Sequence, residues 1–238
     1  MPHVASHIKV LFTGAVVAIA AVLAAASCGG GKGAPAELLT NAGFEDGKSG
    51  WTALTTDAVW EPRFDIADGV ANSGARSAYL KMRTDAATPK THIFGVTQEV
   101  TPDAFPSEIS GYYRVDNWQR ATVKQYMQVV VVVFNAENKP DPAFPNHQIR
   151  YILAGIGTPP FAIGNAKYMF LRPADPPQGQ WVPFKLNVAD DFQRLWGAVP
   201  EQFEKVRLLF EVRFDDKAPD ERPSADVYFD DLHVGKPT

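Results

Sequence analysis

The residues best suited to chemistry are aromatic rings and planar polar groups that alternate with apolar residues along predicted strands. Rings stack on flat apolar surfaces, and guanidinium, amide and carboxylate groups exchange paired hydrogen bonds with hydroxyl groups. In one strand Leu208, Phe210 and Val212 share a face, so Glu211 and Arg213 must point the other way. The sequence thus offers candidates for binding a carbohydrate or similar polyol: Tyr112, Arg114, Trp118, Tyr126, Gln128, Arg150, Glu211 and Arg213.

The same residues also have a purely structural interpretation. Charged side chains that face each other across strands form ion pairs worth about 0.2–1 kcal/mol each. Trp118 lies in the polar segment Asp116-Asn117-Trp118-Gln119, where it would either contact a ligand from a loop or pack on the rim of the fold. The other tryptophans are expected to fill the core or its edge: Trp51, Trp60, Trp181 and Trp196.

Catalytic motifs are missing from the sequence. It contains no Gly-x-Ser-x-Gly, His-Glu-x-x-His or Gly-x-x-x-x-Gly-Lys motif, nor the Glu-x-Asp-x-x-Glu spacing of some jelly-roll glycosidases. Beyond the N-terminal segment the histidines, His92, His147 and His233, are far apart. Arg213 beside Glu211 is expected to favour the charged form of that carboxylate, which suits a general acid poorly. We therefore assign no catalytic residue.

The elements that must position these residues are mostly short strands. Apolar residues alternate with polar ones around 78–82, 109–115 and 207–213, and the run Val129–Val133 is apolar throughout, as in a central strand covered on both faces. Further strands are expected near 37–44, 57–62, 92–100, 147–154, 166–172, 181–187 and 225–234. About ten strands without alternating helices predict an all-β, two-sheet antiparallel sandwich.

One short helix is expected between two of these strands. Asn187 precedes residues 188–196, in which Phe192, Leu195 and Trp196 share one face, and Gly197 follows. The apolar stripe predicts that the helix caps the sandwich by packing on it, with binding of a partner as the alternative.

The N-terminal residues have the pattern of an export signal. Lys9 precedes an uncharged run from Val10 to Ala26, which makes residues 1–27 a predicted signal peptide rather than a retained membrane anchor. Ala25-Ala26-Ser27-Cys28 resembles the lipobox of bacterial lipoproteins, although Leu is usual at the position of Ala25. The resemblance implies acylation of Cys28 and export to the cell envelope; an ordinary signal with an incidental cysteine is the alternative. Residues 28–36 then form a flexible tether, and residues 37–238 form the folded domain.

Both ends of that domain carry motifs of one family. Asn41-Ala42-Gly43-Phe44-Glu45 with Gly50-Trp51, the segments 73–80 and 96–100, and the closing 227–234 with Asp230-Asp231 resemble carbohydrate-binding modules of the galactose-binding-like jelly-roll type. The resemblance covers roughly 37–115 and 205–235 and leaves 136–204 unmatched. It implies a jelly roll and a structural calcium ion held by Glu45 with Asp230 or Asp231, whose carboxylates are suitable ligands. The alternative is that these acids are solvated or cap turns.

Charge and composition exclude some functions. The chain has 23 Lys and Arg against 27 Asp and Glu, a net charge of -4, so it has no surplus of positive charge for binding nucleic acid. Its single cysteine excludes an intrachain disulfide. The sequence predicts a lipid-anchored domain that binds carbohydrate without chemistry. A lipoprotein that binds a protein partner is the first alternative, and a polysaccharide hydrolase or lyase is the second.

Overall fold

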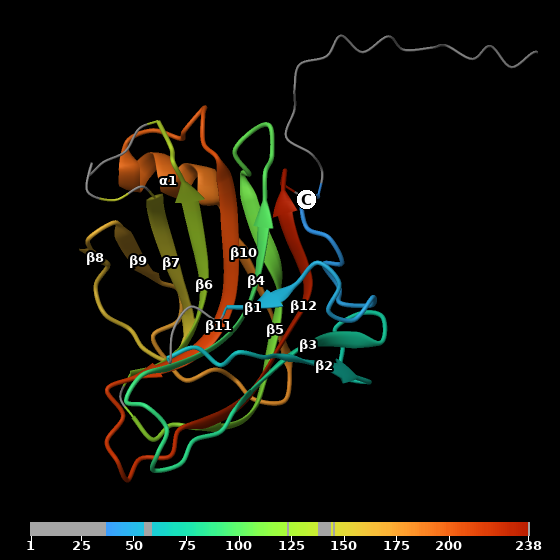
Figure 1. Ribbon diagram of the computed structural model, residues 1–238, viewed down its shortest axis with the longest axis vertical. Coiled ribbons are helices and arrows are strands. Elements are labelled where there is room, and N and C mark those ends of the chain that lie inside the picture. Colours follow the sequence, from blue (N-terminus) through green and yellow to red (C-terminus); the bar gives the residue numbers. More distant parts are fainter. Residues whose placement is uncertain (1–36, 55–58, 123, 138–143, 145, 238) are drawn as a thin grey trace, which may run out of the picture. The chain divides into compact units, whose positions relative to one another are not determined.

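The computed structural model describes residues 37–54, 59–122, 124–137, 144 and 146–237. In this part of the chain, strands form two sheets that pack face to face (Figure 1). The seven-stranded sheet has the spatial order β1 (Thr52–Ala53), β4 (His92–Val100), β11 (Lys205–Asp215), β6 (Lys124–Phe134), β7 (Asn146–Ala154), β9 (Ala166–Phe170) and β8 (Phe161–Ile163). The five-stranded sheet has the order β10 (Trp181–Leu186), β5 (Glu108–Gln119), β12 (Ser224–Gly235), β3 (Arg76–Met82) and β2 (Asp65–Asp68). The predicted all-β sandwich is confirmed.

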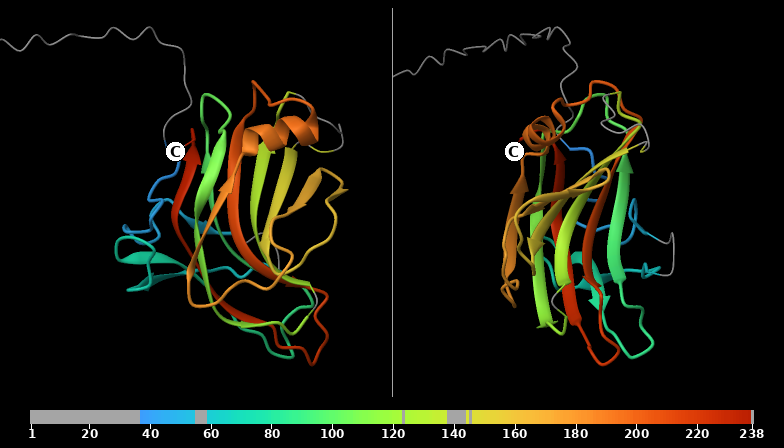
Figure 2. Two further views of the ribbon diagram at one scale, coloured as in Figure 1. Left: turned by 180° about the vertical axis from the view of Figure 1, so that it is seen from behind. Right: turned by 90° about the vertical axis from the view of Figure 1, so that its left-hand side faces the viewer.

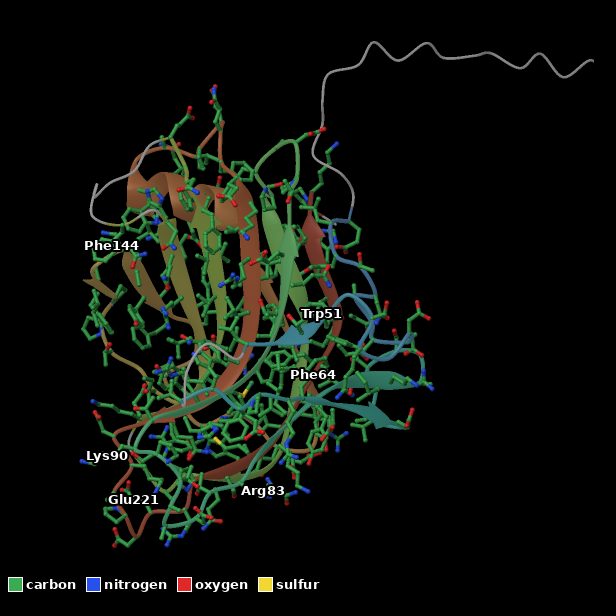
Figure 3. The ribbon with its side chains drawn as sticks, in the orientation of Figure 1. Trp51, Phe64, Arg83, Lys90, Phe144 and Glu221 are labelled. Carbon is green, nitrogen blue, oxygen red and sulfur yellow. The ribbon has the colours of Figure 1, made fainter. Side chains whose placement is uncertain are left out.

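The core lies between the sheets and follows the alternation expected from the sequence. Leu208, Phe210 and Val212 of β11 are fully buried, and Ile109 and Val115 of β5 face them from the other sheet. Removing such side chains from water contributes about 1.5–3 kcal/mol each. At one end of the core Trp51, labelled in Figure 3, packs against the rings of Phe44 and Phe210, as expected for a core tryptophan.

Strand β6 is the central strand of the seven-stranded sheet and is covered on both faces. Val129, Val131 and Val133 belong to the core, whereas Val130 and Val132 point away from it and pack under Leu54, Trp60 and Phe134. The predicted burial of both faces is therefore confirmed. Trp60 covers the outer face of this sheet rather than the core.

The expected helix is α1, Val188–Trp196, which crosses one end of the seven-stranded sheet (Figures 1 and 2). Phe192 is fully buried, and Leu195 and Trp196 are partly buried against the core. The helix ends because Gly197 takes a left-handed conformation, with φ of 85°, and its N–H bonds the carbonyl of Gln193. Packing by the apolar stripe is confirmed.

Several element predictions were wrong. Residues 37–44 form no strand: the chain bends at Thr40 and Asn41 and turns at Ala42 and Gly43, and Asn41 and Phe44 have φ of 53° and 58°, outside the extended region. Of the predicted strand at 57–62, the described part makes only an isolated bridge between Trp60 and Ile93. The sheets are antiparallel except for β7 and β9, which run parallel. No helix in the described ranges is long and apolar enough to span a bilayer. The predicted signal, Cys28 and the tether lie outside the described residues.

Candidate functional site

The open face, defined as the side of the seven-stranded sheet that points away from the five-stranded sheet, brings five of the eight candidates together. Glu211 lies opposite Gln128, and Arg213 lies opposite Tyr126, on strands β11 and β6. Arg150 follows on the neighbouring strand β7. The prediction that these side chains share one face is correct.

Two other candidates lie elsewhere. Tyr112 and Arg114 belong to β5 of the five-stranded sheet and point away from the core on its outer side. Arg114 lies between Trp181 and Tyr228 of the adjacent strands, and its Nε donates to Asp116 Oδ2 at 3.0 Å. Alternation predicts which residues point outward but not which sheet a strand joins, so the single site expected from the sequence is split between two faces.

Trp118 is a further correction. Instead of lying in an exposed loop, it belongs to β5, is 8% exposed and packs in the core. The reason is local: Asn117 takes a φ of 53°, and the pairing of β5 with β12 shifts register between Asp116 and Gln119. Such a bulge re-aims the following side chain. Trp118 therefore has no access to a ligand on either outer face.

Four of the five candidates on the open face are almost completely buried, contrary to the expectation that they are available to a ligand. The exposed fractions of Tyr126, Gln128 and Glu211 are 6%, 0% and 1%, and the Arg213 side chain is 13% exposed. They cover one another: the Arg213 guanidinium lies 5.5 Å from the Tyr126 ring centroid. Asp215 holds both, because it accepts from the Tyr126 hydroxyl at 2.9 Å and from Arg213 Nη2 at 2.5 Å.

Burial also changes the titration of this cluster. Loss of water raises the pKa of Glu211, and this outweighs the opposing effects of Arg213, Arg150 and the hydrogen bond from Gln128. Arg213 does favour the charged form, as expected from the sequence, but burial outweighs it, so the net shift of the Glu211 pKa is opposite to the expectation. Burial likewise raises the pKa of the Tyr126 hydroxyl. With so little access to solvent, Glu211 is poorly placed to exchange a proton with a substrate.

An aromatic cavity of about 700 Å³ lies on the open face beside the β8–β9 hairpin. The rings of Phe161 and Tyr168 stack with centroids 4.4 Å apart and planes at 14°, and Phe170 lies 5.9 Å from Phe161. The Phe161 side chain is 40% exposed, so its ring is accessible to a ligand. Tyr126 forms part of the wall.

The hairpin positions these rings by its register. Gly164 turns the chain with a φ of 54°, which pairs Phe161 with Tyr168. Met169 packs on the core, so Tyr168 and Phe170 face the opposite side. Phe144, labelled at this edge in Figure 3, lies against the turn, where a Cβ on Gly164 would come 3.2 Å from its ring.

None of Phe161, Tyr168 and Phe170 is among the site residues predicted from the sequence. The alternation of Tyr168 and Phe170 with Lys167 and Met169 was a usable signal, because it places both rings on one face of the expected strand.

Charges of both signs line the rest of the cavity. Lys124 pairs with Asp216, and Arg120 Nε pairs with Asp175 Oδ1 at 2.7 Å. Asp215 lines the same side. The cavity thus combines flat aromatic surfaces with carboxylate, ammonium and guanidinium groups. Such an arrangement can stack an apolar ring face and hydrogen-bond hydroxyl groups at the ring's edge.

The predicted calcium ligands lie around one loop, residues 72–76. Glu45 Oε1 accepts from the backbone N–H groups of Ala75 and Arg76 at 2.9 and 3.0 Å. Asp230 Oδ2 accepts from the N–H of Asn72 at 2.6 Å, and Asp231 accepts from the Ser73 hydroxyl and the Asn72 amide.

These oxygens face N–H and O–H donors, which a cation would have to displace. Within the described ranges no three His, Cys, Asp or Glu side chains cluster closely enough to hold a metal ion. Calcium binding stays a prediction of the sequence.

Comparison with known proteins finds similarity only at the level of structure. No family model matches the chain. No curated protein sequence matches it either. Similar solved structures include a CBM61 module in complex with β-1,4-galactotriose, with 11% identity, 83% of this chain and 97% of that chain covered, and a TM-score of 0.42.

A second is a CBM28 module specific for non-crystalline cellulose, with 14% identity, 83% of this chain and 94% of that chain covered, and a TM-score of 0.42. A third is the K2 adhesin domain of Lys-gingipain, with 10% identity, 81% of this chain and 96% of that chain covered, and a TM-score of 0.41. Identities this low and TM-scores below 0.5 do not assign a ligand to this chain.

Proposed function

We propose that this domain binds a carbohydrate chain in the aromatic cavity beside the β8–β9 hairpin and performs no chemistry on it. The observation that carries the proposal is the partly exposed stack of Phe161 and Tyr168 next to Phe170, in a cavity that charged residues also line. A sugar ring has an apolar face and an edge of hydroxyl groups, so it matches a wall of rings and a rim of charged acceptors and donors.

A binding role suits the site better than catalysis. The acid on this face with a raised pKa, Glu211, is 1% exposed, and its carboxylate accepts a hydrogen bond from Gln128. General acid catalysis requires the acid to reach the leaving oxygen at hydrogen-bond distance. Release of reducing ends or unsaturated products from a bound polysaccharide would contradict this part of the proposal.

We further propose that the domain is exported and anchored to the bacterial cell envelope by acyl chains on Cys28. Support comes from the sequence: an uncharged run, a lipobox-like Ala25-Ala26-Ser27-Cys28 and a glycine-rich tether before the domain. Acyl chains would hold the protein at the membrane, and the tether would let the cavity reach a glycan nearby.

The proposal is tested by screening the full-length protein for retardation in native gels that each contain one polysaccharide, with xylan, galactan, soluble cellulose derivatives and polyuronates among them. We expect retardation in at least one gel and none in the gel without polysaccharide. A protein that is retarded by none of them and binds nothing on a broad glycan array does not bind carbohydrate.

Binding of a protein partner is a second candidate function, and the exposed edge strand β8 of the same hairpin supports it. All three residues of β8 are exposed, with Ile163 at 62%, and nearby Leu171 is 44% exposed. An exposed edge strand can pair with a strand of another protein. Ile163→Lys would block such pairing, whereas Phe161→Ala would weaken glycan binding more than Ile163→Lys does. The two variants together separate the two functions.

A further inference from the structure

A second, smaller hollow of about 190 Å³ lies on the open face at the other side of Arg150 from the aromatic cavity. Apolar side chains form much of its lining: Val130, Val132 and Leu209 of the sheet, with Leu54 and Trp60. Its polar lining consists of Asn146, Gln148, Arg150, Arg207 and Glu211.

Arg150 is the cation of this hollow that forms no ion pair among the described residues, although its charge opposes the rise in the pKa of Glu211. Its Nε and Nη2 both donate to one neutral acceptor, Gln148 Oε1, at 3.3 and 2.9 Å, which leaves Nη1 without a hydrogen bond among the described residues. No Asp or Glu in that part of the chain forms an ion pair with it. The other cations of the open face are paired: Lys205 and Arg207 with Glu99, and Arg213 with Asp215.

The amide groups beside Arg150 add further donors. Because Gln148 Oε1 accepts from Arg150, the NH2 group of Gln148 must point elsewhere. Asn146 is oriented similarly, since its Oδ1 accepts from Asn165 and its own NH2 group has no acceptor among the described residues. Glu211 is the single carboxylate in the lining; it is 1% exposed, it accepts a hydrogen bond from Gln128, and burial raises its pKa.

Arg150 is also next to the aromatic cavity. It pairs in register with Tyr168 of β9, and its guanidinium lies 5.5 Å from the centroid of the Tyr168 ring. Register neighbours on adjacent strands are about 5 Å apart. A sugar chain bound in the aromatic cavity would therefore have substituents close to the guanidinium.

We propose that this hollow binds an anionic substituent of the glycan, either the carboxylate of a uronic acid residue or a sulfate ester, through Arg150 with the amides of Gln148 and Asn146. The inference rests on the proposed carbohydrate function and assigns it an acidic ligand class. A planar guanidinium matches an oxyanion in both charge and geometry, and charge-assisted hydrogen bonds are roughly twice as strong as neutral ones.

The test compares matched ligands. Binding of the full-length protein is measured by calorimetry with oligogalacturonate and its methyl ester, which keeps the same sugar chain but removes the charge, and with a keratan sulfate oligosaccharide, which carries sulfate but no carboxylate, and its desulfated form. We expect one acidic ligand to bind about tenfold or more tightly than its neutral counterpart, and increasing salt to reduce that advantage. The acidic ligand that does so identifies the anion as carboxylate or sulfate.

The variant Arg150→Gln should remove the preference, lowering affinity for the acidic ligand about tenfold or more while leaving that for its neutral counterpart unchanged. Arg114→Gln on the other sheet is the matched control and should change neither. If neutral glycans bind and acidic ones bind no tighter, or if Arg150→Gln weakens both classes equally, the anion subsite is wrong while the carbohydrate function stands. If no glycan of either class binds, both proposals fall.

Discussion

Gln128 and Glu211 lie directly opposite each other on β6 and β11, and Gln128 Nε2 donates to Glu211 Oε2 at 2.5 Å. Both residues point to the open face, yet their exposed fractions are 0% and 1%. Burial removes the water that would solvate the Glu211 carboxylate. The hydrogen bond from Gln128 and the two nearby arginines do not fully compensate for this loss, and the pKa of Glu211 is therefore raised. The pair therefore makes stability depend on pH.

The first prediction concerns that dependence. A folded-state pKa above the unfolded value of about 4.3 means that the native state keeps a proton that the unfolded state has lost. The contribution of Glu211 to the free energy of unfolding should fall as pH rises from about 4 through the folded pKa. Glu211→Gln removes the titrating group, so the variant should be the more stable protein at about pH 8, by roughly 1–3 kcal/mol.

The measurement is urea unfolding of both proteins between about pH 4 and 8, which gives the free energy of unfolding at each pH. Glu99→Gln is the control, because the pKa of Glu99 is shifted in the opposite direction to that of Glu211. Hydrogen bonds from Lys205 and Arg207 lower the pKa of Glu99, so its contribution is present above the unfolded pKa and is lost in acid. That variant should lose up to about 1 kcal/mol at neutral pH. Parallel curves for wild type and Glu211→Gln would show that Glu211 titrates normally.

A second prediction compares the stability contributions of Arg213 and Arg114, both of which alternate with core-facing residues along their strands. Arg213 stacks on Tyr126 and pairs with Asp215, and its side chain is 13% exposed, so Arg213→Ala should cost about 2–4 kcal/mol of stability. Arg114→Ala removes a half-exposed ion pair on the other sheet and should cost no more than about 1 kcal/mol. Thermal unfolding followed by circular dichroism compares them. Equal melting temperatures for the two variants would mean that the buried cluster contributes little.

For these two arginines the sequence predicted the side-chain orientation but not the sheet to which each strand belongs. Alternation correctly predicted that Leu208, Phe210 and Val212 face the core and that Arg213 faces outward. The same argument placed Arg114 outward, which is also correct, but it carries no information on strand order. Strand β5 joins the five-stranded sheet through contacts with β10 and β12 that are distant in sequence. The two arginines therefore lie on opposite sides of the sandwich.

The remaining errors at the site have local causes. The polar residues around Trp118 favoured a loop, but strand β5 continues through Gln119. The left-handed conformation of Asn117 turns the Trp118 indole toward the core. Burial of Tyr126 depends on Arg213 and Asp215 from a strand some 90 residues later, which no local pattern reveals. The rings of Phe161 and Tyr168 meet only because the hairpin pairs them, so their stack could not be read from either residue alone.

The third prediction concerns calcium. An ion bound by Glu45, Asp230 and Asp231 in the native state alone would stabilise it by about 2.7 kcal/mol at a hundredfold excess over Kd. Calcium should then raise the melting temperature, a chelator should lower it, and Asp230→Asn should abolish both effects. Burial raises the pKa of Asp230 to about 6 in the metal-free protein, so the effect should weaken as pH falls below that value.

A melting temperature that responds to neither calcium nor chelator would contradict the calcium prediction. The three carboxylates would then serve as hydrogen-bond acceptors for the loop 72–76, the role in which the structure places them.

The fourth prediction concerns the anchor. Cys28→Ala should abolish acylation and move the protein from the membrane fraction to the soluble fraction, because no other segment of the sequence is proposed to hold it there. Fractionation of cells followed by immunoblotting compares the variant with wild type, and Ser27→Ala is a conservative control that should stay in the membrane. Intact-mass measurement of the mature wild-type protein that finds an unmodified Cys28 would rule the lipoprotein proposal out.

We propose that the exposed rings beside the β8–β9 hairpin bind the glycan, and the affinities of ring variants test this proposal. Affinity for a polysaccharide that retards the protein is determined for wild type, Phe161→Ala, Tyr168→Ala and the control Trp181→Ala, whose ring lies on the other sheet. We predict that each hairpin variant binds about tenfold more weakly with its melting curve preserved, while Trp181→Ala binds as wild type does. Full affinity in both folded hairpin variants would contradict the account.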